Sequence, residues 1–407
     1  MNCVNFGKSV LPIPSKFFGK AEWLIPKEDP IPLLNVQHAV IEALRSPIGS
    51  KPLREKVKIE DRIAIIVSDI TRPVPTAQIL PPLLDELRSC GIPVEKITII
   101  FGLGIHRSMT TAEKAQVLGE EVFLNYRAIE PQEYVCLGET TRGTPIEVCR
   151  EVAEADFVIL TGNIEYHYFA GYSGGYKALM PGVSTKKAIQ NNHKMMLHPK
   201  AAIGTTDENP VRNDIEEFGR VLPNTFLLNV LLGTQKEVTH VLAGDPILAH
   251  RVGCGILDQY FKVRVPKAAD LIIVSSGGYP KDINLYQAQK ALENAARVTK
   301  EGGTIVLVAE LKEGFGEETF KQWLENCKST EEILARIQKE FVLGGHKAAA
   351  IAMLLKNYNI YLLSTLPAES VRNVFLKPLD NLSDLPVKEA DIIYILPYGN
   401  QTLPELQ

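Results

Sequence analysis

Residues 61–102, DRIAIIVSDITRPVPTAQILPPLLDELRSCGIPVEKITIIFG, decide the fold of this chain. Two apolar runs rich in β-branched residues, 61–68 and 96–102, are typical of strands that are covered on both faces. Between them, residues 77–89 have helical spacing, and we expect Pro81–Pro82 to interrupt the first turns of that helix. A strand, a helix and a second strand in this order predict a parallel βαβ unit.

The same alternation continues along the chain. A third apolar run covers residues 155–161, and a second series of strands and helices begins near residue 268, after the stretch VRVPKAA at 263–269. In that series we expect strands at 270–275, 303–309, 359–364 and 391–396, and helices at 285–298, 318–326 and 330–340. The sequence therefore predicts an α/β fold: two α/β domains, 1–265 and 266–407, with largely parallel sheets and an active-site cleft between them.

Composition excludes several classes of protein. With 44 Lys and Arg against 48 Asp and Glu, the net charge is −4, and no basic tract points to nucleic acid. No apolar run reaches the ~18 residues of a membrane span. The first residues lack the apolar segment of a signal peptide, so we expect a cytoplasmic protein. The six cysteines form no CxxC pair, which argues against a disulfide framework and a structural zinc site.

Residues suited to catalysis follow three of the predicted strands. Asp69 and Arg72 come after the first, His106 after the second, and Glu165 and His167 after the third. Because open α/β sheets bind ligands beyond the carboxyl ends of their strands, these residues are candidates for one active site. The alternative is a set of solvated loop ends, in which Asp69 caps a turn or a helix.

The segment 167–193, HYFAGYSGGYKALMPGVSTKKAIQNNH, carries the most chemistry. Gly171, Gly174 and Gly175 would let backbone N–H groups approach an anion, as in a nest. Lys177 follows, but the GxxxxGK[ST] spacing of a P-loop is not met. Burial would lower the pKa of this lysine and favour covalent attachment to a carbonyl or acyl group, whereas a solvated Lys177 would bind phosphate.

His193 ends the same segment, on or near a helix that starts around Thr185. Together with His106 and His167 it could form a three-histidine zinc site, although no HxH or HExxH spacing favours one. The other interpretation of His193 is an ordinary surface or core side chain.

The C-terminal domain offers a second group of polar residues. On the predicted helix, Tyr286, Gln287 and Lys290 share one face and could clamp a carboxylate. The alternative is a capping box of Asn284 and Gln287 beside a solvated Lys290. Residues 344–347 (GGHK) are a weaker signal, for a helix start or a supporting group.

These short motifs occur in an order and spacing that resemble the nickel-pincer lactate racemase family, over roughly residues 60 to 300. The motifs are Asp69-x-x-Arg72-Pro73, Gly104-x-His106-Arg107, His167-x-Phe169-Ala170-Gly171-x-Ser173-Gly174-Gly175-x-Lys177, His193 and Tyr286-Gln287-x-x-Lys290.

The resemblance implies a cofactor and the residues that hold it. The family uses a nickel-bound pyridinium mononucleotide with thioamide and thiocarboxylate groups, attached by match to Lys177, with His193 as the protein ligand of Ni(II). Gly174 and Gly175 would contact this nickel-pincer nucleotide, and Asp69 would either contact it or orient a neighbouring basic group. Other enzymes build the cofactor, so we expect recombinant protein made without these partners to lack it.

The resemblance also implies an isomerase, a racemase or epimerase of lactate or another small 2-hydroxy acid. Its α-hydrogen would move as a hydride, while His106 and His167 act as alternating acid and base. Substrate binding would fall to Arg72 and the Tyr286–Lys290 face. Two other functions stay open from the residues alone: a zinc-dependent hydrolase using the three histidines, and a non-catalytic anion-binding protein.

Overall fold

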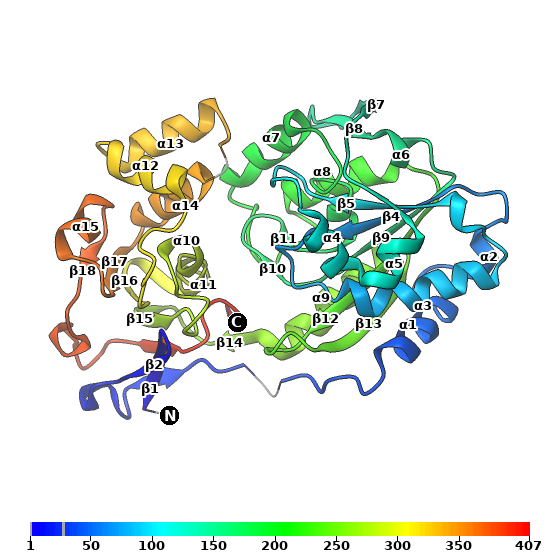
Figure 1. Cartoon of the computed structure of the whole chain (residues 1–407). Coiled ribbons are helices and arrows are strands. Elements are labelled where there is room, and N and C mark those ends of the chain that lie inside the picture. The colour runs from blue at the N-terminus through cyan, green and yellow to red at the C-terminus, as the bar shows by residue number, and fades with distance from the viewer. Residues whose placement is uncertain (1, 27–28, 343) are drawn as a thin grey trace. The chain divides into compact units, whose positions relative to one another are not determined.

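A computed structural model describes residues 2–26, 29–342 and 344–407 (Figure 1). The chain divides into two units, an N-terminal unit of Asp29–Asp258 and a C-terminal unit that joins the first 28 residues to Gln259–Gln407. This division differs from the predicted domains 1–265 and 266–407, because the start of the chain belongs to the C-terminal unit. The change of unit falls within helix α9 (Leu248–Phe261), a few residues before the predicted break.

The N-terminal unit is built on a six-stranded sheet of order β13-β12-β9-β4-β5-β6. All neighbours are parallel except β12 and β13, an antiparallel pair that the sequence analysis did not predict. The strands are β4 (Ile63–Ser68), β5 (Ile97–Gly102), β6 (Arg127–Ile129), β9 (Phe157–Asn163), β12 (Thr225–Leu232) and β13 (Val238–Gly244).

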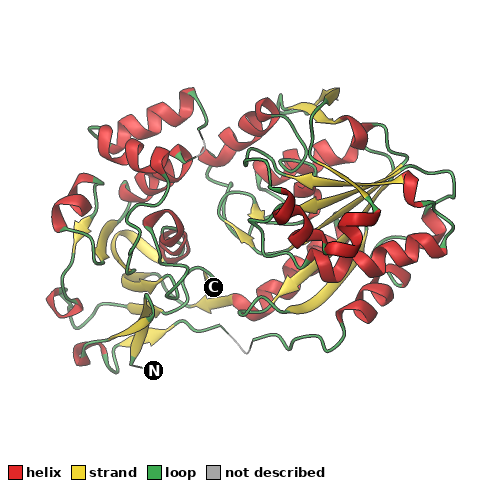
Figure 2. Cartoon of the chain, in the orientation of Figure 1, coloured by secondary structure: helices red, strands yellow, loops and turns green. Residues whose placement is uncertain are grey.

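Helices accompany this sheet (Figure 2). They are α1 (Val36–Arg45), α2 (Leu53–Lys56), α3 (Thr76–Ser89), α4 (Thr111–Leu118), α5 (Glu120–Asn125), α6 (Arg150–Ala153), α7 (Lys186–Lys194), α8 (Pro210–Arg220) and α9. Two short antiparallel ribbons complete the unit, β7 (Tyr134–Glu139) with β8 (Pro145–Cys149) and β10 (Tyr166–His167) with β11 (Gly171–Tyr172). Single 3-10 turns lie at η2 (Val94–Lys96), η3 (Gly175–Ala178) and η4 (Met195–Leu197).

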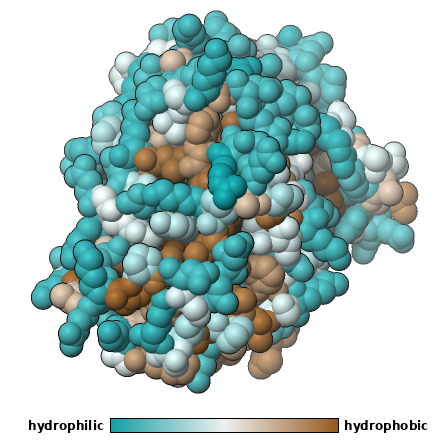
Figure 3. Space-filling model, turned by 90° about the vertical axis from the view of Figure 1, so that its left-hand side faces the viewer, coloured by the Kyte–Doolittle hydropathy of each residue, from teal (hydrophilic) through white to brown (hydrophobic). Residues whose placement is uncertain are grey.

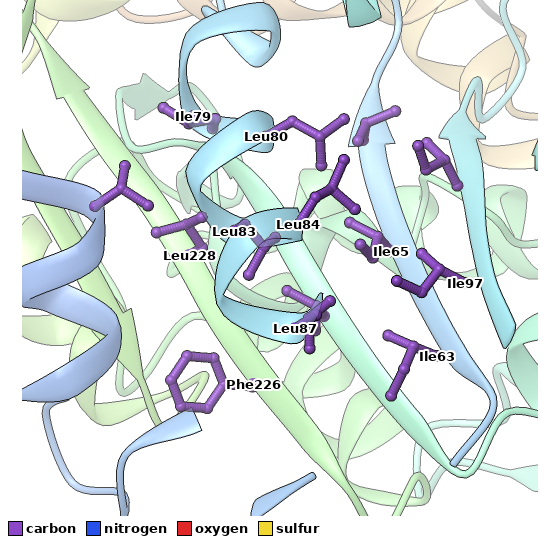
Figure 4. Close-up of a cluster of buried hydrophobic side chains, with 14 of the residues drawn as sticks. Ile63, Ile65, Ile79, Leu80, Leu83, Leu84, Leu87, Ile97, Phe226 and Leu228 are labelled. Atoms are coloured by element: carbon purple, nitrogen blue, oxygen red, sulfur yellow. The ribbon is translucent and has the colours of Figure 1, made fainter. Parts of the chain in front are cut away.

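Helix α3 is continuous, contrary to the interruption predicted at its two prolines. Each proline removes one helical hydrogen bond, at a net cost of about 0.5–1.5 kcal/mol. Leu80, Leu83 and Leu87 of this helix are completely buried against the sheet, and each contributes about 1.5–3 kcal/mol. Figure 4 shows these side chains between α3 and the strands, so packing outweighs the lost hydrogen bonds.

The C-terminal unit has a six-stranded, fully parallel sheet of order β18-β17-β16-β15-β19-β3. Its strands are β3 (Ala21–Trp23), β15 (Ala269–Ser275), β16 (Thr299–Val308), β17 (Asn359–Leu363), β18 (Lys377–Pro378) and β19 (Ile393–Leu396). Its helices are α10 (Leu285–Ala288), α11 (Lys290–Ala296), α12 (Glu318–Asn326), α13 (Thr330–Lys339), α14 (Gly345–Leu355) and α15 (Ala368–Asn373). The remaining elements are β1 (Cys3–Phe6), β2 (Ser9–Pro12), β14 (Lys262–Val265), β20 (Leu403–Leu406), η1 (Ser15–Phe17) and η5 (Leu382–Asp384).

The start of the chain completes the C-terminal unit. β3 pairs in parallel with β19 and so forms one edge of the sheet. The β1–β2 hairpin places Val4 in the same core as Ile273 and Val306. The buried carboxylate of Asp282 accepts a hydrogen bond of 2.7 Å from the backbone N–H of Gly7. These contacts explain why the first residues fold with the C-terminal part of the chain.

The predicted α/β fold with largely parallel sheets is confirmed, since both sheets alternate with helices. One predicted helix, 285–298, is divided at Gln289 into α10 and α11. Within the part of the chain that the structure describes, every helix is too short or too polar to cross a membrane. The face in Figure 3 is mostly hydrophilic, and its hydrophobic residues form smaller patches between the polar ones.

Candidate functional site

Three adjacent strands of the N-terminal unit lead into the predicted catalytic residues. β9, β4 and β5 are neighbours and run parallel, so their carboxyl ends meet at one edge of the sheet. Asp69 directly follows β4, His106 lies in the loop after β5, and His167 lies in β10 just beyond β9. The topology therefore brings these three residues to the same edge, as the strand pattern predicted.

Asp69 and His106 form a buried carboxylate–imidazole pair. The Nδ1 atom of His106 lies 2.5 Å from Oδ2 of Asp69, whose side chain is only 2% exposed. Burial alone would raise the pKa of Asp69, but hydrogen bonds from His106 and Thr71 outweigh it and lower the pKa below its usual value. The carboxylate thus accepts the Nδ1 proton of His106, which leaves Nε2 as the nitrogen with a lone pair.

Arg72 is exposed at the end of the same turn, where its N–H donates to the backbone oxygen of Asp69. Within the described residues, no side-chain hydrogen bond or ion pair engages its guanidinium. Its positive charge is one of the influences that lower the pKa of both His167 and Lys177. Arg72 therefore lies within electrostatic reach of both residues.

His167 has a different environment from His106. It is half-buried in the β10–β11 hairpin, and its Nδ1 accepts a hydrogen bond of 3.2 Å from the N–H of Ala170. Burial, followed by the positive charges of Lys177 and His193, lowers its pKa well below the usual value. The ring is therefore neutral near pH 7, with its proton on Nε2.

The glycines before Lys177 are required for packing. Gly171 has a φ of +76°, and a Cβ there would lie 1.7 Å from the backbone oxygen of Thr205. The N–H of Gly175 donates to Oδ1 of Asn229 at 2.9 Å. A Cβ on Gly174 would lie 2.5 Å from the same amide oxygen. The N–H of Gly175 is therefore bonded within the protein, so of the three glycines in the predicted anion nest this one does not offer its N–H to an anion.

Lys177 has the environment of a nucleophilic amine. It lies in η3, half-buried, and its Nζ lies 5.9 Å from the centre of the Phe169 ring. Burial, and then the charges of Arg212 and Arg72, lower its pKa well below the usual value, while Glu165 acts weakly in the opposite direction. A lowered pKa increases the fraction of unprotonated amine, the form that attacks a carbonyl or acyl carbon.

The Phe169 ring is the common neighbour of the predicted cofactor and base residues. The centre of this ring lies 4.6 Å from that of His167, 4.9 Å from that of His193 and 5.9 Å from Nζ of Lys177. His106 belongs to the same region, because its loop bonds to the segment after Lys177 through Gly104 N–H and the Gly182 oxygen, 2.8 Å apart. The predicted residues of this unit thus converge.

A chain of hydrogen bonds orients His193, which is buried near the end of α7. Nδ2 of Asn192 donates to Asp214 at 2.8 Å and to the backbone oxygen of Val211 at 3.1 Å. Its Oδ1, 3.0 Å from Nδ1 of His193, therefore accepts the proton of that nitrogen. Nε2 of His193 is then the unprotonated nitrogen, which is the form that binds a metal ion.

The described residues contain no group of three or more His, Cys, Asp or Glu side chains that could hold a metal ion. This disfavours the three-histidine zinc site considered from the sequence. A metal held mainly by cofactor sulfurs needs only one protein nitrogen, and His193 presents one. The neutral amine of Lys177 and the oriented His193 therefore fit a tethered sulfur-ligated metal better than a zinc ion held by protein alone.

The C-terminal unit holds Tyr286, Gln287 and Lys290 around the junction of α10 and α11. Asn284 caps α10 by accepting the N–H of Gln287 at 3.0 Å, as the capping interpretation predicted, and Lys290 is exposed. The junction residue Gln289 keeps helical angles, with φ −57° and ψ −22°, so the three side chains remain close to helical spacing. Capping and carboxylate binding are therefore compatible here.

Lys347 joins this group, although no role of its own was predicted for it from the sequence. Its Nζ donates to the backbone oxygen of Tyr286 at 2.5 Å and lies 3.6 Å from the centre of that ring. The pKa of Glu293 is raised to about 8 by burial, against the opposing charges of Lys347 and Lys290. His346 is buried, and burial followed by the charge of Lys347 lowers its pKa to about 3, so it is a neutral structural residue.

Sequence reasoning also missed Arg212 and Asn192. Both act through buried contacts with residues distant in the sequence, which no local pattern reports. The only local signal was Asn209-Pro210, a helix start that places Arg212 in the first turn of α8.

Comparisons with known proteins cover most of the chain. Residues 13–204 match the family described as the lactate racemase N-terminal domain, and residues 265–393 match the lactate racemase C-terminal domain. A lactate racemase of Thermoanaerobacterium thermosaccharolyticum is 31% identical over 363 residues, 86% of this chain and 85% of that protein. A lactate racemase of Lactiplantibacillus plantarum is 36% identical over 308 residues, 74% of this chain and 72% of that protein.

Solved structures give a similar result. The lactate racemase apoprotein of T. thermosaccharolyticum matches with a TM-score of 0.88 at 28% identity, over 99% of both chains. A protein from Thermotoga maritima matches with a TM-score of 0.66 at 18% identity, over 94% of this chain and all of that one. The second likeness concerns the fold alone.

Proposed function

The chain belongs to the lactate racemase family, and from this premise we propose that it racemises or epimerises lactate or a related small 2-hydroxy acid. The observation that carries the proposal is the grouping of His167, Lys177 and His193 around the Phe169 ring. This group supplies one base, one nucleophilic amine and one metal-binding imidazole, and His106 of the same unit supplies the second base.

Lys177 and His193 would hold the nickel-pincer nucleotide. The amine of Lys177 would carry the covalent link, and Nε2 of His193 would coordinate Ni(II). The chemistry that this group supplies when bound is reversible acceptance of the substrate's α-hydrogen as a hydride. Asp69 is 3% exposed and occupied by His106 and Thr71, so in this proposal it orients His106 and does not contact the cofactor.

His106 and His167 would move the proton of the substrate hydroxyl. Loss of a hydride from the α-carbon requires that the hydroxyl oxygen lose its proton, so that a keto group forms. Nε2 of His106 can accept this proton, and Asp69 then stabilises the imidazolium that results. Because the two enantiomers present their hydroxyl groups differently to a planar acceptor, His167 would serve the second enantiomer, and its Nδ1 would accept a proton after it releases the N–H of Ala170.

Carboxylate binding is assigned to residues that the family resemblance implies. Arg72 has an exposed guanidinium that can grip a carboxylate with two parallel hydrogen bonds. We assign the same role to Gln287 and Lys290, with Tyr286 beside them, as the family resemblance implies. Lys347 binds the backbone of Tyr286 and so steadies this face.

The test is to produce the chain together with cofactor-building enzymes and to measure its mass, nickel content and racemisation of single-enantiomer 2-hydroxy acids. We expect a covalent adduct on Lys177 and interconversion of at least one acid. Substrate deuterated at the α-carbon should react more slowly and keep its label, since a hydride does not exchange with water.

The control is Lys177→Ala produced in the same way, which should fold, carry no adduct and be inactive. An adduct that persists in this variant would contradict the attachment site. Rapid loss of deuterium to solvent would contradict hydride transfer and favour direct removal of the α-proton.

A further inference from the structure

Arg212 is a completely buried arginine at the start of α8. Its Nε donates to the backbone oxygen of Ala170 at 3.2 Å and its Nη1 to that of Gly174 at 3.3 Å. Its Nη2 donates to the backbone oxygen of Tyr172. One guanidinium therefore holds three carbonyl groups of the loop that leads directly into Lys177.

The hydrogen bonds of this guanidinium go to neutral carbonyl groups. The charged group with the largest effect on the pKa of Arg212 is the Glu216 carboxylate. Glu216 forms its own ion pair with Arg251 at 2.8 Å. Burial accordingly lowers the pKa of Arg212 to about 10, which still leaves the group charged near pH 7. Burying a charge without a direct counter-charge is costly, and a neutral side chain could fill the same space.

The location of this charge indicates what it does. Arg212 is the first charged group among those that lower the pKa of Lys177, ahead of Arg72. The loop that it holds, 170–174, ends at the turn containing the lysine. The same side chain thus fixes the backbone that carries Lys177 and makes an ammonium at that position unfavourable.

We propose that Arg212 is a positioning residue for attachment at Lys177: through its three carbonyl contacts and its buried charge, it makes Lys177 a reactive amine in the protein before any cofactor is bound. This inference rests on the proposed function only for the identity of the group that is attached. The reactivity itself is a property of the protein alone.

Charged and titratable groups on several elements interact electrostatically with Lys177. They are Arg72 after β4, Glu165 after β9, His167 in β10, Arg212 in α8 and His250 in α9. Only Glu165 favours the ammonium, so removal of Arg212 takes away the largest single charge that opposes it.

The experiment labels the protein with N-acetoxysuccinimide at several pH values and follows each lysine by peptide mass spectrometry. The amine nitrogen forms a bond to the acetyl carbon, N-hydroxysuccinimide leaves, and the amine proton passes to the buffer. Lys186 on the exposed start of α7 is the internal reference. In the wild type, Lys177 should reach half-maximal labelling at a lower pH than Lys186.

In Arg212→Met, the half-labelling pH of Lys177 should rise, and for each unit by which it exceeds 7.5 the labelling rate at pH 7.5 should fall about tenfold relative to Lys186. Asn229→Ala is the matched control, because Asn229 holds the residue that follows this loop, through the N–H of Gly175 at 2.9 Å, but carries no charge. It should leave the half-labelling pH unchanged. An unchanged pH dependence in Arg212→Met, or an equal rise in Asn229→Ala, would overturn the proposal.

If Arg212→Met does not fold, Arg212→Lys tests the same proposal. It keeps the charge and loses the three-way contact, so the half-labelling pH should stay low while hydrogen exchange of amides 170–176 becomes faster. Unchanged exchange, or a half-labelling pH equal to that of Lys186, would overturn the proposal. A protein that labels as expected but racemises no 2-hydroxy acid would refute the proposed function and leave this inference standing.

Discussion

His106 and His167 are the same residue type at the same sheet edge, yet their surroundings are opposite. His106 is paired at Nδ1 with the Asp69 carboxylate, which orients its ring. Within the described residues, no carboxylate contacts His167, which accepts a backbone N–H at Nδ1 and lies near the positive charges of Lys177, His193 and Arg72. One histidine is thus oriented by a carboxylate, whereas the other is kept neutral by burial and by positive charges.

The difference teaches how one site can serve two mirror-image substrates without two equivalent bases. Enantiomers have equal free energies, so the equilibrium constant of racemisation is one and kcat/KM must be equal in both directions. Two unequal histidines can therefore give the enantiomers different kcat values, but the KM values must then differ by the same factor. Under the proposed function, we expect the two substrates to differ in kcat and KM while their ratios agree.

The largest effect should come from removing either ring. His106→Ala and His167→Ala in cofactor-loaded protein should each lower racemisation by about 10²- to 10⁴-fold, the usual range for loss of an acid–base group. Initial rates from each pure enantiomer, followed by chiral chromatography, provide the measurement. His38→Ala is the control, since His38 is exposed on α1 and its side chain is 66% accessible. Wild-type turnover in either active-site variant would end the two-base scheme.

A smaller effect should follow from changing only the partner of His106. Asp69→Asn keeps the size of the side chain but removes the carboxylate that holds Nδ1, so we expect about a 10- to 100-fold loss of kcat. Thr71→Val removes only the hydroxyl that donates to Asp69 at 2.6 Å, and its loss should be smaller. If Thr71→Val is as damaging as Asp69→Asn, the carboxylate does not act through His106.

The smallest effect should appear in the pH dependence of stability. The lowered pKa of His167 means that the unfolded chain binds more protons below about pH 6.5, so stability falls as the pH drops through that range. The lowered pKa of Asp69 adds stability that is present above about pH 3.9 and is lost below it. Melting temperatures at a series of pH values measure both contributions.

His167→Gln should flatten the fall between about pH 6.5 and pH 5, whereas Asp69→Asn should alter only the more acidic part. The slope should not vanish in His167→Gln, because His250 and His346 also have lowered pKa values and act with the same sign. A steeper fall in His167→Gln would mean that the ring is charged in the folded protein.

The sequence predicted the fold well because its strands are long apolar runs, and such runs form buried parallel strands whatever surrounds them. It also predicted that Asp69, His106 and His167 would meet, since consecutive βαβ strands usually lie side by side. The packing energy of a helix could not be predicted from its local sequence. The continuous α3 with its two prolines and the division at Gln289 depend on contacts with the sheet.

The parts of the site that escaped prediction depend on contacts distant in sequence. Arg212 lies about forty residues from the carbonyl groups that it binds, and Lys347 lies 61 residues from Tyr286. The Gly175 amide looked available to an anion until Asn229, 54 residues later, proved to be its acceptor. Residue type and spacing suggested the chemistry of Lys177, whereas its charged neighbours could be identified only from the structure.

The pairing of β3 with β19 has a consequence for synthesis on the ribosome. Trp23 emerges early, but its partner Ile395 is made near the end of the chain, on the order of tens of seconds later. The whole of Asp29–Asp258 leaves the exit tunnel in that interval and can fold first. Strand β3 therefore stays unpaired until β19 has been synthesised. A truncated message or a separately expressed C-terminal fragment accordingly produces a sheet with an uncovered edge.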